Sequence, residues 1–486
     1  MSARLANEMP IGWRYAPLEE VCEVIQGQSP PGNTYNAQGR GLPFFQGKAE
    51  FGDYYPTPKK WCSAPAKIAE PDDVLISIRA PVGPTNLCLT RACIGRGLAA
   101  LRPKDGMPSR YLLYAVRATV DRLVAKGTGS TFEAVSGKDL RGHKITVAPP
   151  DEQRRIVAEI EKQFTRLEAG VAGLRRVQAN LKRYRAAVLK AACEGKLVPT
   201  EAELARQEGR TYESGEQLLA RILTERRQKW TGHGRYKEPT GPDSTNLPPP
   251  LEGWTWCMSD SLFSFVTSGS RGWAKYYSDS GAIFLRIGNL DHENIRLDLG
   301  DIQHVTPPTG TEGVRTMVQA NDILISITAD VGMVALVPDG LGEAYINQHV
   351  ALARPSPPVC PRYVAYYLCG SEGGWGYFKK LQRGATKVGL GLDDIRSVPV
   401  PLPPLAEQER IVAEVERRLS VVEELEAVVS ASLQRGTRLR QAVLQLAFEG
   451  KLVRTEEVGM WSSSHDLPIA AEAPSTYKQS RERRRK

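Results

Sequence analysis

The side chains that could make this chain an enzyme are few, and their spacing does not suit catalysis. A PD…ExK nuclease centre needs acidic groups and a lysine around one metal ion, and Pro71-Asp72 with Glu194-Gly195-Lys196 offers those residue types. The two pieces are 122 residues apart, however, and Gly195 ends a long helical pattern, where glycine is suited to cap a helix. We therefore expect no nuclease centre.

Motifs that would hold a target base for methylation, a nucleotide or a metal are missing as well. A base methyltransferase carries Pro-Pro between Asn, Asp or Ser and Tyr or Phe, and the pairs at residues 149, 307 and 403 have other neighbours. Gly-Lys at residues 47, 137, 195 and 450 is never followed by the Ser or Thr of a phosphate loop. Cys88 and Cys93 could form half of a metal site, but no second Cys or His pair stands at ligand spacing. We expect buried, reduced thiols and no cofactor in this chain.

The most informative feature is a long internal repeat. Pro-Pro-Asp-Glu-Gln-Arg-Arg-Ile-Val from Pro149 returns as Pro-Pro-Leu-Ala-Glu-Gln-Glu-Arg-Ile-Val from Pro403, and Glu-Gly-Lys-Leu-Val from Glu194 returns from Glu449. Both echoes have an offset of 255 residues between the matching Glu or Gly positions. Two helices of equal length are therefore predicted, each starting after Pro-Pro and ending at a capping glycine.

The repeat extends into the segments before these helices. Asp-Val-Leu-Ile-Ser-Ile from Asp73 matches Asp-Ile-Leu-Ile-Ser-Ile from Asp322, Ile94–Pro103 matches Ile346–Pro355, and Gly12-Trp13 matches Gly253-Trp254. These are short β-branched runs bounded by Gly and Pro, which indicate strands. The connections between them differ, and loops of this kind carry recognition while the strands carry packing.

Apolar residues in the two predicted helices recur every seven positions. This seam consists of Ile160, Leu167, Leu174, Leu181 and Val188, and at +255 of Val415, Val422, Val429 and Val443, with Gly436 as the exception. A heptad seam requires a partner helix, which the repeat supplies. A pseudo-two-fold relation would close the pair, so we expect the helices to be antiparallel. The predicted fold class is α+β: two α/β domains separated by a pair of long antiparallel coiled-coil helices, with a pseudo-two-fold internal repeat.

The predicted organisation has six parts. They are an α/β domain over 1–150, a spacer helix over 151–198, a linker with a short helix over 199–250, a second α/β domain over 251–404, a second spacer helix over 405–455 and a disordered basic tail over 456–486. The linker helix is expected from Glu216 to Trp230. The net charge of +9 favours a polyanionic partner. No run of 18 apolar residues and no apolar signal segment at the start are present, so we expect a cytoplasmic protein.

These motifs resemble those of the specificity subunits of type I restriction-modification systems, over nearly the whole chain. The most specific elements are the paired helix starts and the paired Glu-Gly-Lys-Leu-Val endings; Gly384–Leu390 also fits. The resemblance implies that each α/β domain is a target recognition domain for one half of a split DNA site. It implies partners as well: double-stranded DNA, two methyltransferase subunits and ATP-dependent restriction subunits, which would use S-adenosylmethionine, ATP and Mg²⁺. This chain would supply the DNA sequence specificity and no catalysis.

Candidate DNA contacts are polar residues beside strand ends and Gly-rich turns, because Arg or Lys suits guanine and Asn or Gln suits adenine. In the first domain we select Gln46, Lys48, Arg79, Arg96, Lys126 and Thr131. In the second domain we select Arg286, Asn289, Asn347, Gln348, Thr386 and Lys387. The two domains differ at matching positions, so an asymmetric site is expected.

Two other hypotheses remain open. The chain could be a recognition subunit that works with a single-chain restriction-methylation enzyme of another type, which neighbouring genes for separate subunits would exclude. It could also be a coiled-coil organising protein without a DNA role, which a gel shift with the methyltransferase complex would exclude.

Overall fold

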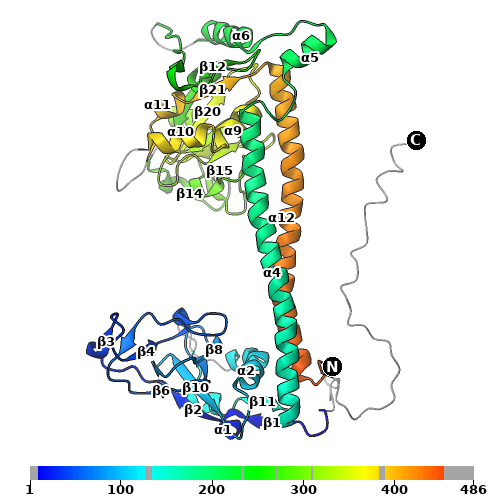
Figure 1. Ribbon diagram of the computed structural model, residues 1–486. Coiled ribbons are helices and arrows are strands. Elements are labelled where there is room, and N and C mark those ends of the chain that lie inside the picture. The colour runs from blue at the N-terminus through cyan, green and yellow to red at the C-terminus, as the bar shows by residue number, and fades with distance from the viewer. Residues whose placement is uncertain are drawn as a thin grey trace. The chain divides into compact units, whose positions relative to one another are not determined.

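The computed structural model describes residues 9–125, 134–230, 235–269, 271–307, 310–382 and 389–453, and the statements below concern these residues. The chain forms two compact units (Figure 1). Unit 1 consists of Met1–Ala172 and Leu433–Lys486, and unit 2 is the continuous segment Gly173–Ser432. The predicted tail over 456–486 lies outside the described residues.

The α/β part of unit 1 has eleven short strands among its described residues. They are β1 (Arg14–Pro17), β2 (Cys22–Gln26), β3 (Tyr35–Asn36), β4 (Leu42–Phe45), β5 (Trp61–Cys62), β6 (Ile68–Ala69), β7 (Val74–Ser77), β8 (Thr85–Leu87), β9 (Ala92–Ile94), β10 (Leu98–Pro103) and β11 (Lys144–Val147). Its short helices are α1 (Leu18–Val21), α2 (Ser109–Val124) and α3 (Gly137–Arg141). The strands form sheets of order β2-β10-β7-β8, β1-β11 and β3-β5-β4-β9-β6.

The α/β part of unit 2 repeats this plan. Its strands are β12 (Thr255–Met258), β13 (Phe263–Ser268), β14 (Tyr277–Ser278), β15 (Ala282–Leu285), β16 (Gln303–Val305), β17 (Ile323–Ser326), β18 (Val334–Leu336), β19 (Ala344–Ile346), β20 (Val350–Pro355) and β21 (Pro399–Leu402). Its helices are α7 (Ser259–Leu262), α8 (Thr311–Thr316), α9 (Pro361–Cys369), α10 (Gly374–Leu381) and α11 (Leu392–Arg396).

The two α/β parts share their sheet topology except at β6 of unit 1, which has no counterpart in the matching sheet of unit 2, β14-β16-β15-β19. The order β13-β20-β17-β18 corresponds to β2-β10-β7-β8, and β12-β21 corresponds to β1-β11. The parallel pair β15–β19 corresponds to the parallel pair β4–β9. The predicted strands around Asp73 and Asp322 are β7 and β17, each at the same place in its sheet. The sequence repeat is therefore a repeat of fold.

An equivalent ion pair in each α/β part accounts for the charged residues that the repeated strand segments share. Arg102 on β10 donates two hydrogen bonds to the buried carboxylate of Asp73, at 3.0 and 2.9 Å. Arg354 on β20 does the same to Asp322, at 2.7 Å each. Each pair connects two adjacent strands of one sheet. The two parallel hydrogen bonds neutralise the buried carboxylate and also fix the distance between the two strands.

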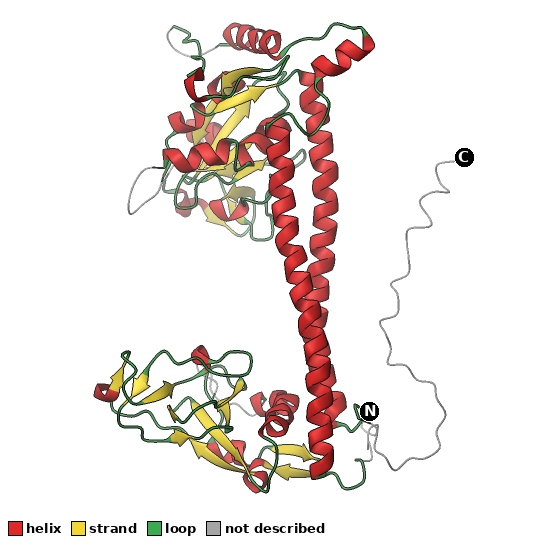
Figure 2. Cartoon of the chain, in the orientation of Figure 1, coloured by secondary structure: helices red, strands yellow, loops and turns green. Residues whose placement is uncertain are grey.

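The long helices are α4 (Pro150–Cys193) and α12 (Leu405–Phe448), each of 44 residues (Figure 2). In unit 1, Glu168 of α4 accepts a hydrogen bond from Arg440 of α12 at 2.8 Å. In unit 2, Arg185 of α4 donates to Glu426 of α12 at 3.0 Å. Within unit 1, Gly436 of α12 also lies against Val171 of α4, so higher numbers on α4 meet lower numbers on α12 and the helices run antiparallel, as the repeat predicted.

The seam positions of both helices are turned away from solvent. Ile160, Val415 and Val422 are at most 1% exposed, Leu181, Val188 and Val429 are buried, and Leu167, Leu174 and Val443 are half-buried. At the exception, Gly436, a Cβ would stand 3.2 Å from the Cγ2 of Val171. Both helices end at glycines with positive φ, +65° at Gly195 and +72° at Gly450, which is the capping role expected from the sequence.

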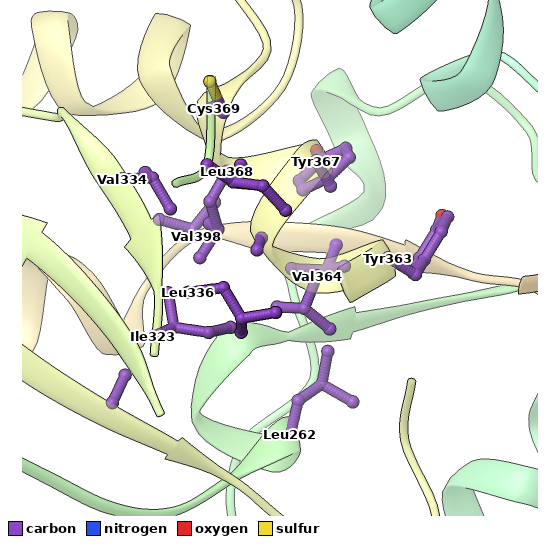
Figure 3. Packing of buried hydrophobic residues seen from close by; sticks show 14 of the residues in the cluster. Leu262, Ile323, Val334, Leu336, Tyr363, Val364, Tyr367, Leu368, Cys369 and Val398 are labelled. Carbon is purple, nitrogen blue, oxygen red and sulfur yellow. The ribbon is translucent and has the colours of Figure 1, made fainter. Parts of the chain in front are cut away.

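Each α/β core is completed by a long helix. In unit 1, Leu444, Ala447 and Phe448 of α12 join the cluster built around α2. In unit 2, Val188, Leu189 and Ala192 of α4 join the cluster built around α9. Figure 3 shows part of the latter, with Val364 and Leu368 of α9 on the side of the helix toward Ile323, Val334 and Leu336 of the sheet. Each fully buried Val, Leu, Ile or Phe side chain among them contributes roughly 1.5–3 kcal/mol.

The segment between α4 and the second α/β part holds two helices where one was expected. The predicted linker helix is α6 (Gly215–Gln228), and an additional helix, α5 (Glu201–Glu208), precedes it. Thr200 and Glu203 form the reciprocal capping box that starts α5. Along the described ranges, no helix is long and apolar enough to cross a membrane.

Candidate nucleic-acid interface

Three of the residues selected from the sequence surround one hollow in unit 1. Gln46, Arg79 and Arg96 lie at its edge, together with Ser29, Ala80 and Gly97. Its volume is about 490 Å³. Lys48, two residues beyond Gln46, begins a short 3-10 turn (Lys48–Glu50), and its side chain is exposed. Residues 50 apart in sequence thus meet because β4, β7 and β9 all end here.

Backbone hydrogen bonds hold the three loops together. The N–H of Gly95 donates to the carbonyl of Phe45 at 2.8 Å, and that of Ile78 donates to the carbonyl of Gly97 at 2.9 Å. A bridge between Arg79 and Ala134 adds a third connection. The hollow is therefore lined by main chain that is fixed in place, and the polar side chains project from it.

Gly97 is required by this close approach. A Cβ at this position would lie 2.3 Å from the carbonyl oxygen of Gln46, well inside van der Waals contact. The Gly95-Arg96-Gly97 sequence therefore places one arginine between two residues that let the neighbouring loop come close. The guanidinium of Arg96 is carried on a turn that has little freedom to move.

The charge of the hollow is not neutralised by nearby acids. Arg79 and Arg96 are exposed, and within the described part of the chain neither guanidinium forms an ion pair. Other arginines of the same unit are paired, for example Arg91 with Glu70 at 3.1 Å. Glu50, four residues after Gln46, accepts hydrogen bonds from the backbone N–H groups of Gln46 and Gly47, at 3.3 and 3.2 Å, and not from either arginine of the hollow. A positive, donor-rich recess of this kind suits an acceptor-rich anionic ligand.

Cys88 and Cys93, the pair singled out in the sequence, are buried in unit 1. Burial raises the pKa of Cys88 and of Cys93 to about 12, so both remain neutral thiols at physiological pH. All eight cysteines are free thiols, and six of them are buried. Among the described residues, no three His, Cys, Asp or Glu side chains are grouped to hold a metal ion.

Unit 2 builds the same loops with different side chains. The N–H of Asn347 donates to Leu285 at 3.0 Å, and that of Ile327 donates to His349 at 2.9 Å. A bridge joins Thr328 to Gly389. Each bond has its counterpart in unit 1, so Thr328 stands where unit 1 has Arg79.

By the same correspondence, Asn347-Gln348-His349 stands where unit 1 has Gly95-Arg96-Gly97. Asn347 Oδ1 accepts the N–H of His349 at 3.0 Å, and Gln348 Nε2 lies 2.9 Å from His349 Nε2. Arg286, the counterpart of Gln46, is ion-paired with Asp301 at 2.9 Å. Arg286, Asn347 and Gln348 are half-buried and polar. Within the described residues, Arg286 has its charge neutralised by an acid, unlike Arg79 and Arg96 of unit 1.

The selection of Asn289 is not supported by its surroundings. Its side chain is 3% exposed. Oδ1 accepts the backbone N–H of Arg286 at 2.8 Å, and Nδ2 donates to the carbonyls of Asp298 and Asp301, at 2.7 and 3.1 Å. The amide therefore closes a loop inside the domain, and it has no free group for a base. Lys126, Thr131, Thr386 and Lys387 lie outside the described residues.

Sequence reasoning missed Ser29. Its Oγ accepts the N–H of Arg96 at 3.4 Å, and it lies in the hollow because β2 pairs with β10. That pairing joins segments about 75 residues apart and leaves no local signal.

A second exposed surface lies on α12 in unit 2. Val421, Leu425 and Val428 are 49%, 46% and 58% exposed. Their spacing of four and three residues places them on one face of the helix, about 90° from the seam. Three large apolar side chains in one exposed stripe are typical of a protein interaction surface.

Comparisons with known proteins agree with the fold and the resemblance. A putative type I restriction enzyme specificity subunit, MjaX, from Methanocaldococcus jannaschii is 39% identical over 158 residues, which cover 32% of this chain and 37% of that protein. The EcoBI specificity subunit from Escherichia coli is 21% identical over 455 residues, 90% of this chain and 86% of its own.

One solved structure, described as showing complex assembly and conformational transition of the type I R-M system, matches with a TM-score of 0.61. It is 21% identical and the match covers 91% of this chain and 99% of that chain, so the fold is shared over nearly the full length. The model of the type I restriction modification DNA specificity domain matches residues 10–171 and 315–427, more than half of the chain. The chain therefore belongs to the family of type I restriction-modification specificity subunits.

Proposed function

We propose that this subunit recognises a bipartite, asymmetric DNA site, with each α/β part contacting one half. The observation that carries the proposal is the pair of matching loop sets: one scaffold is built twice, with Arg79 and Arg96 in unit 1 and Thr328 and Gln348 in unit 2. Loops fixed by the same backbone bonds but carrying different donors and acceptors present different patterns to base edges. Two different half-sites follow.

We further propose that the long helices bind two methyltransferase subunits, and through them the restriction subunits. Support comes from the exposed stripe of Val421, Leu425 and Val428, because such a stripe loses its contact with water when a partner covers it. In this arrangement S-adenosylmethionine, ATP and Mg²⁺ act in the partner subunits, and this chain supplies the DNA sequence specificity.

The DNA proposal is tested by expressing the chain with its methyltransferase partner in a host that lacks DNA methylation. Sequencing the modified genome should reveal a split motif with modified adenines. Replacing residues 1–147 with the first domain of another family member should change one half of that motif only. A change in both halves, or no motif at all, contradicts the proposal. The purified chain alone should neither cut nor methylate DNA.

The docking proposal is tested by Leu425→Glu in the stripe. We expect the methyltransferase to stop co-purifying, while circular dichroism of the isolated subunit is unchanged. Ser430→Glu is the matched control, because residue 430 is exposed on the opposite face of α12. Equal binding by the two variants would show that the stripe is not the docking surface.

A further inference from the structure

We propose that the hollow of unit 1 recognises a G·C base pair, with Arg79 and Arg96 donating to the O6 and N7 atoms of guanine. This inference rests on the proposed function and makes it specific for one base pair. It concerns the unit 1 half-site only.

The donor chemistry of the hollow selects the base. A guanidinium carries N–H donors and no acceptor. In the major groove guanine presents two acceptors side by side, whereas adenine and cytosine each present an amino donor that would face those N–H groups. Thymine has no amino donor but offers a single acceptor, O4, beside its methyl group, so guanine is the base that satisfies the most N–H donors of two arginines at one recess. Gln46, which both donates and accepts, can contact a neighbouring base or the partner strand.

Both arginines are available for this contact. They are exposed, and in the described ranges no acid neutralises them, whereas Arg102 of the same unit is committed to Asp73. A DNA contact by Arg79 or Arg96 therefore breaks no internal ion pair. Their backbones are fixed by the bridge to Ala134 and by the bonds around Gly95 and Gly97. A contact made from a fixed loop costs less ordering on binding than one made from a mobile loop.

Unit 2 supplies the natural control for each arginine. The same backbone positions carry Thr328 and Gln348, and its one selected arginine, Arg286, is paired with Asp301. The substitutions Arg79→Thr and Arg96→Gln therefore place at each site a side chain that this scaffold already carries in its other copy. Neither residue packs in the core, so the fold should be retained.

The experiment uses the subunit assembled with its methyltransferase. The wild-type motif is first read by sequencing the modified genome. Fluorescence anisotropy then measures binding to a 40-base-pair duplex carrying the motif, and to duplexes in which each G·C pair of the unit 1 half-site is replaced by A·T. We expect wild type to lose on the order of 10- to 100-fold in affinity at one or two of these positions. Arg96→Gln or Arg79→Thr should remove that discrimination at one position and leave the unit 2 half-site unchanged.

Arg96→Lys separates recognition of a base from simple charge. Lysine keeps the charge but loses the fork of two parallel donors. If Arg96 contacts guanine, this variant should lose discrimination while keeping the salt dependence of binding. If Arg96 contacts a phosphate, the glutamine variant should weaken all duplexes equally and lower the salt slope by about one, which would overturn the proposal.

Three further outcomes also decide the matter. A unit 1 half-site made only of A·T pairs, or discrimination that survives both substitutions, refutes the guanine contact while leaving the proposed function intact. Equal binding of all duplexes by the wild-type complex would instead refute the proposed function itself. Circular dichroism melting curves of each variant establish that a lost signal is not lost folding.

Discussion

The indole Nε1 of Trp254 donates a hydrogen bond to the buried carboxylate of Glu407 at 2.9 Å. Trp13 and Glu152 make the same contact in unit 1 at 2.8 Å. Glu407 also accepts the N–H of Glu201 at 2.8 Å. Burial raises the pKa of Glu407, and these two donors oppose that effect by stabilising the carboxylate. The contact connects the first strand of each α/β part to the start of its long helix.

We expect Trp254→Phe to lower the free energy of unfolding by about 1–3 kcal/mol, because a fully buried carboxylate loses one of its donors. Trp13→Phe is the matched variant and should cost less, since Glu152 is only half-buried. Urea denaturation followed by circular dichroism measures both. An equal decrease in unfolding free energy for the two variants would show that burial of the carboxylate does not determine how much the lost hydrogen bond destabilises the protein.

Glu201 gives the protein a defined sensitivity to acid. It is buried, and it accepts hydrogen bonds from Arg210 at 2.5 Å and Arg410 at 2.6 Å. Burial raises its pKa, but the two guanidiniums outweigh burial and leave the pKa lowered. A lowered carboxyl pKa stabilises the fold above the unfolded value, and this stability is lost as the pH falls through the folded value.

We therefore expect Glu201→Gln to destabilise the protein by about 1.5–3 kcal/mol at pH 7. The difference from wild type should shrink as the pH falls below about 4.5, the ordinary glutamate value. Glu216→Gln, at an exposed site on α6, is the control and should change little. Unfolding free energies at a series of pH values test this, and a difference that grows in acid would contradict it.

The glycines of the long helices should respond differently to substitution. A Cβ on Gly170 would meet nothing within 4 Å, so Gly170→Ala should stabilise the protein by about 0.5–1 kcal/mol through helix propensity. At Gly436 a Cβ already stands 3.2 Å from Val171, so Gly436→Leu should overpack the seam and cost about 1–3 kcal/mol. Thermal melting temperatures of the two variants test both expectations. A higher melting temperature for Gly436→Leu would show that Val171 moves aside without strain and that the seam is not overpacked.

The helix pair should set the unread gap between the two half-sites. Four residues inserted between Leu174 and Leu181 lengthen α4 by about 6 Å, nearly two base pairs, and rotate the seam by about 40°. We expect a longer spacer or a weaker complex, with both half-site sequences unchanged. Seven residues inserted in each helix keep the heptad phase and add about three base pairs. Sequencing of modified DNA gives the spacer directly. Altered half-site bases with a constant spacer would exclude this role.

The scaffold could be predicted from the sequence because its signals are local or repeated. Pro-Pro marks the helix starts, Gly195 and Gly450 mark the ends, and the seven-residue period marks the buried face. The antiparallel direction of the two long helices could also be predicted, because a two-fold relation between the two repeats pairs the helices with each other. The short helix α5 was missed because its eight residues are mostly polar and show no apolar period, although Thr200 and Glu203 have the spacing of a capping box. The pairing of its Glu201 with Arg410 joins segments far apart in sequence.

The candidate site was only partly accessible to such reasoning. Arg79 and Arg96 could be found because each follows a repeated strand and differs between the copies. Asn289 is likewise a polar residue beside a strand end, yet its side-chain amide is fully hydrogen-bonded inside a loop. Nothing in the sequence separates a polar side chain that closes a turn from one that faces a ligand. That distinction depends on which distant backbone groups come within hydrogen-bond reach.

Unit 1 contains both the beginning and the end of the described chain, and its core needs Leu444, Ala447 and Phe448 of α12. Unit 2 is continuous in sequence. During synthesis, unit 2 can therefore be complete while unit 1 still lacks its last apolar side chains. At about 5–20 residues per second, the ribosome needs roughly 15–60 s to pass from the end of the first segment to these residues. For that time the nascent first domain carries an open apolar face, so the part of the protein that is started first is finished last.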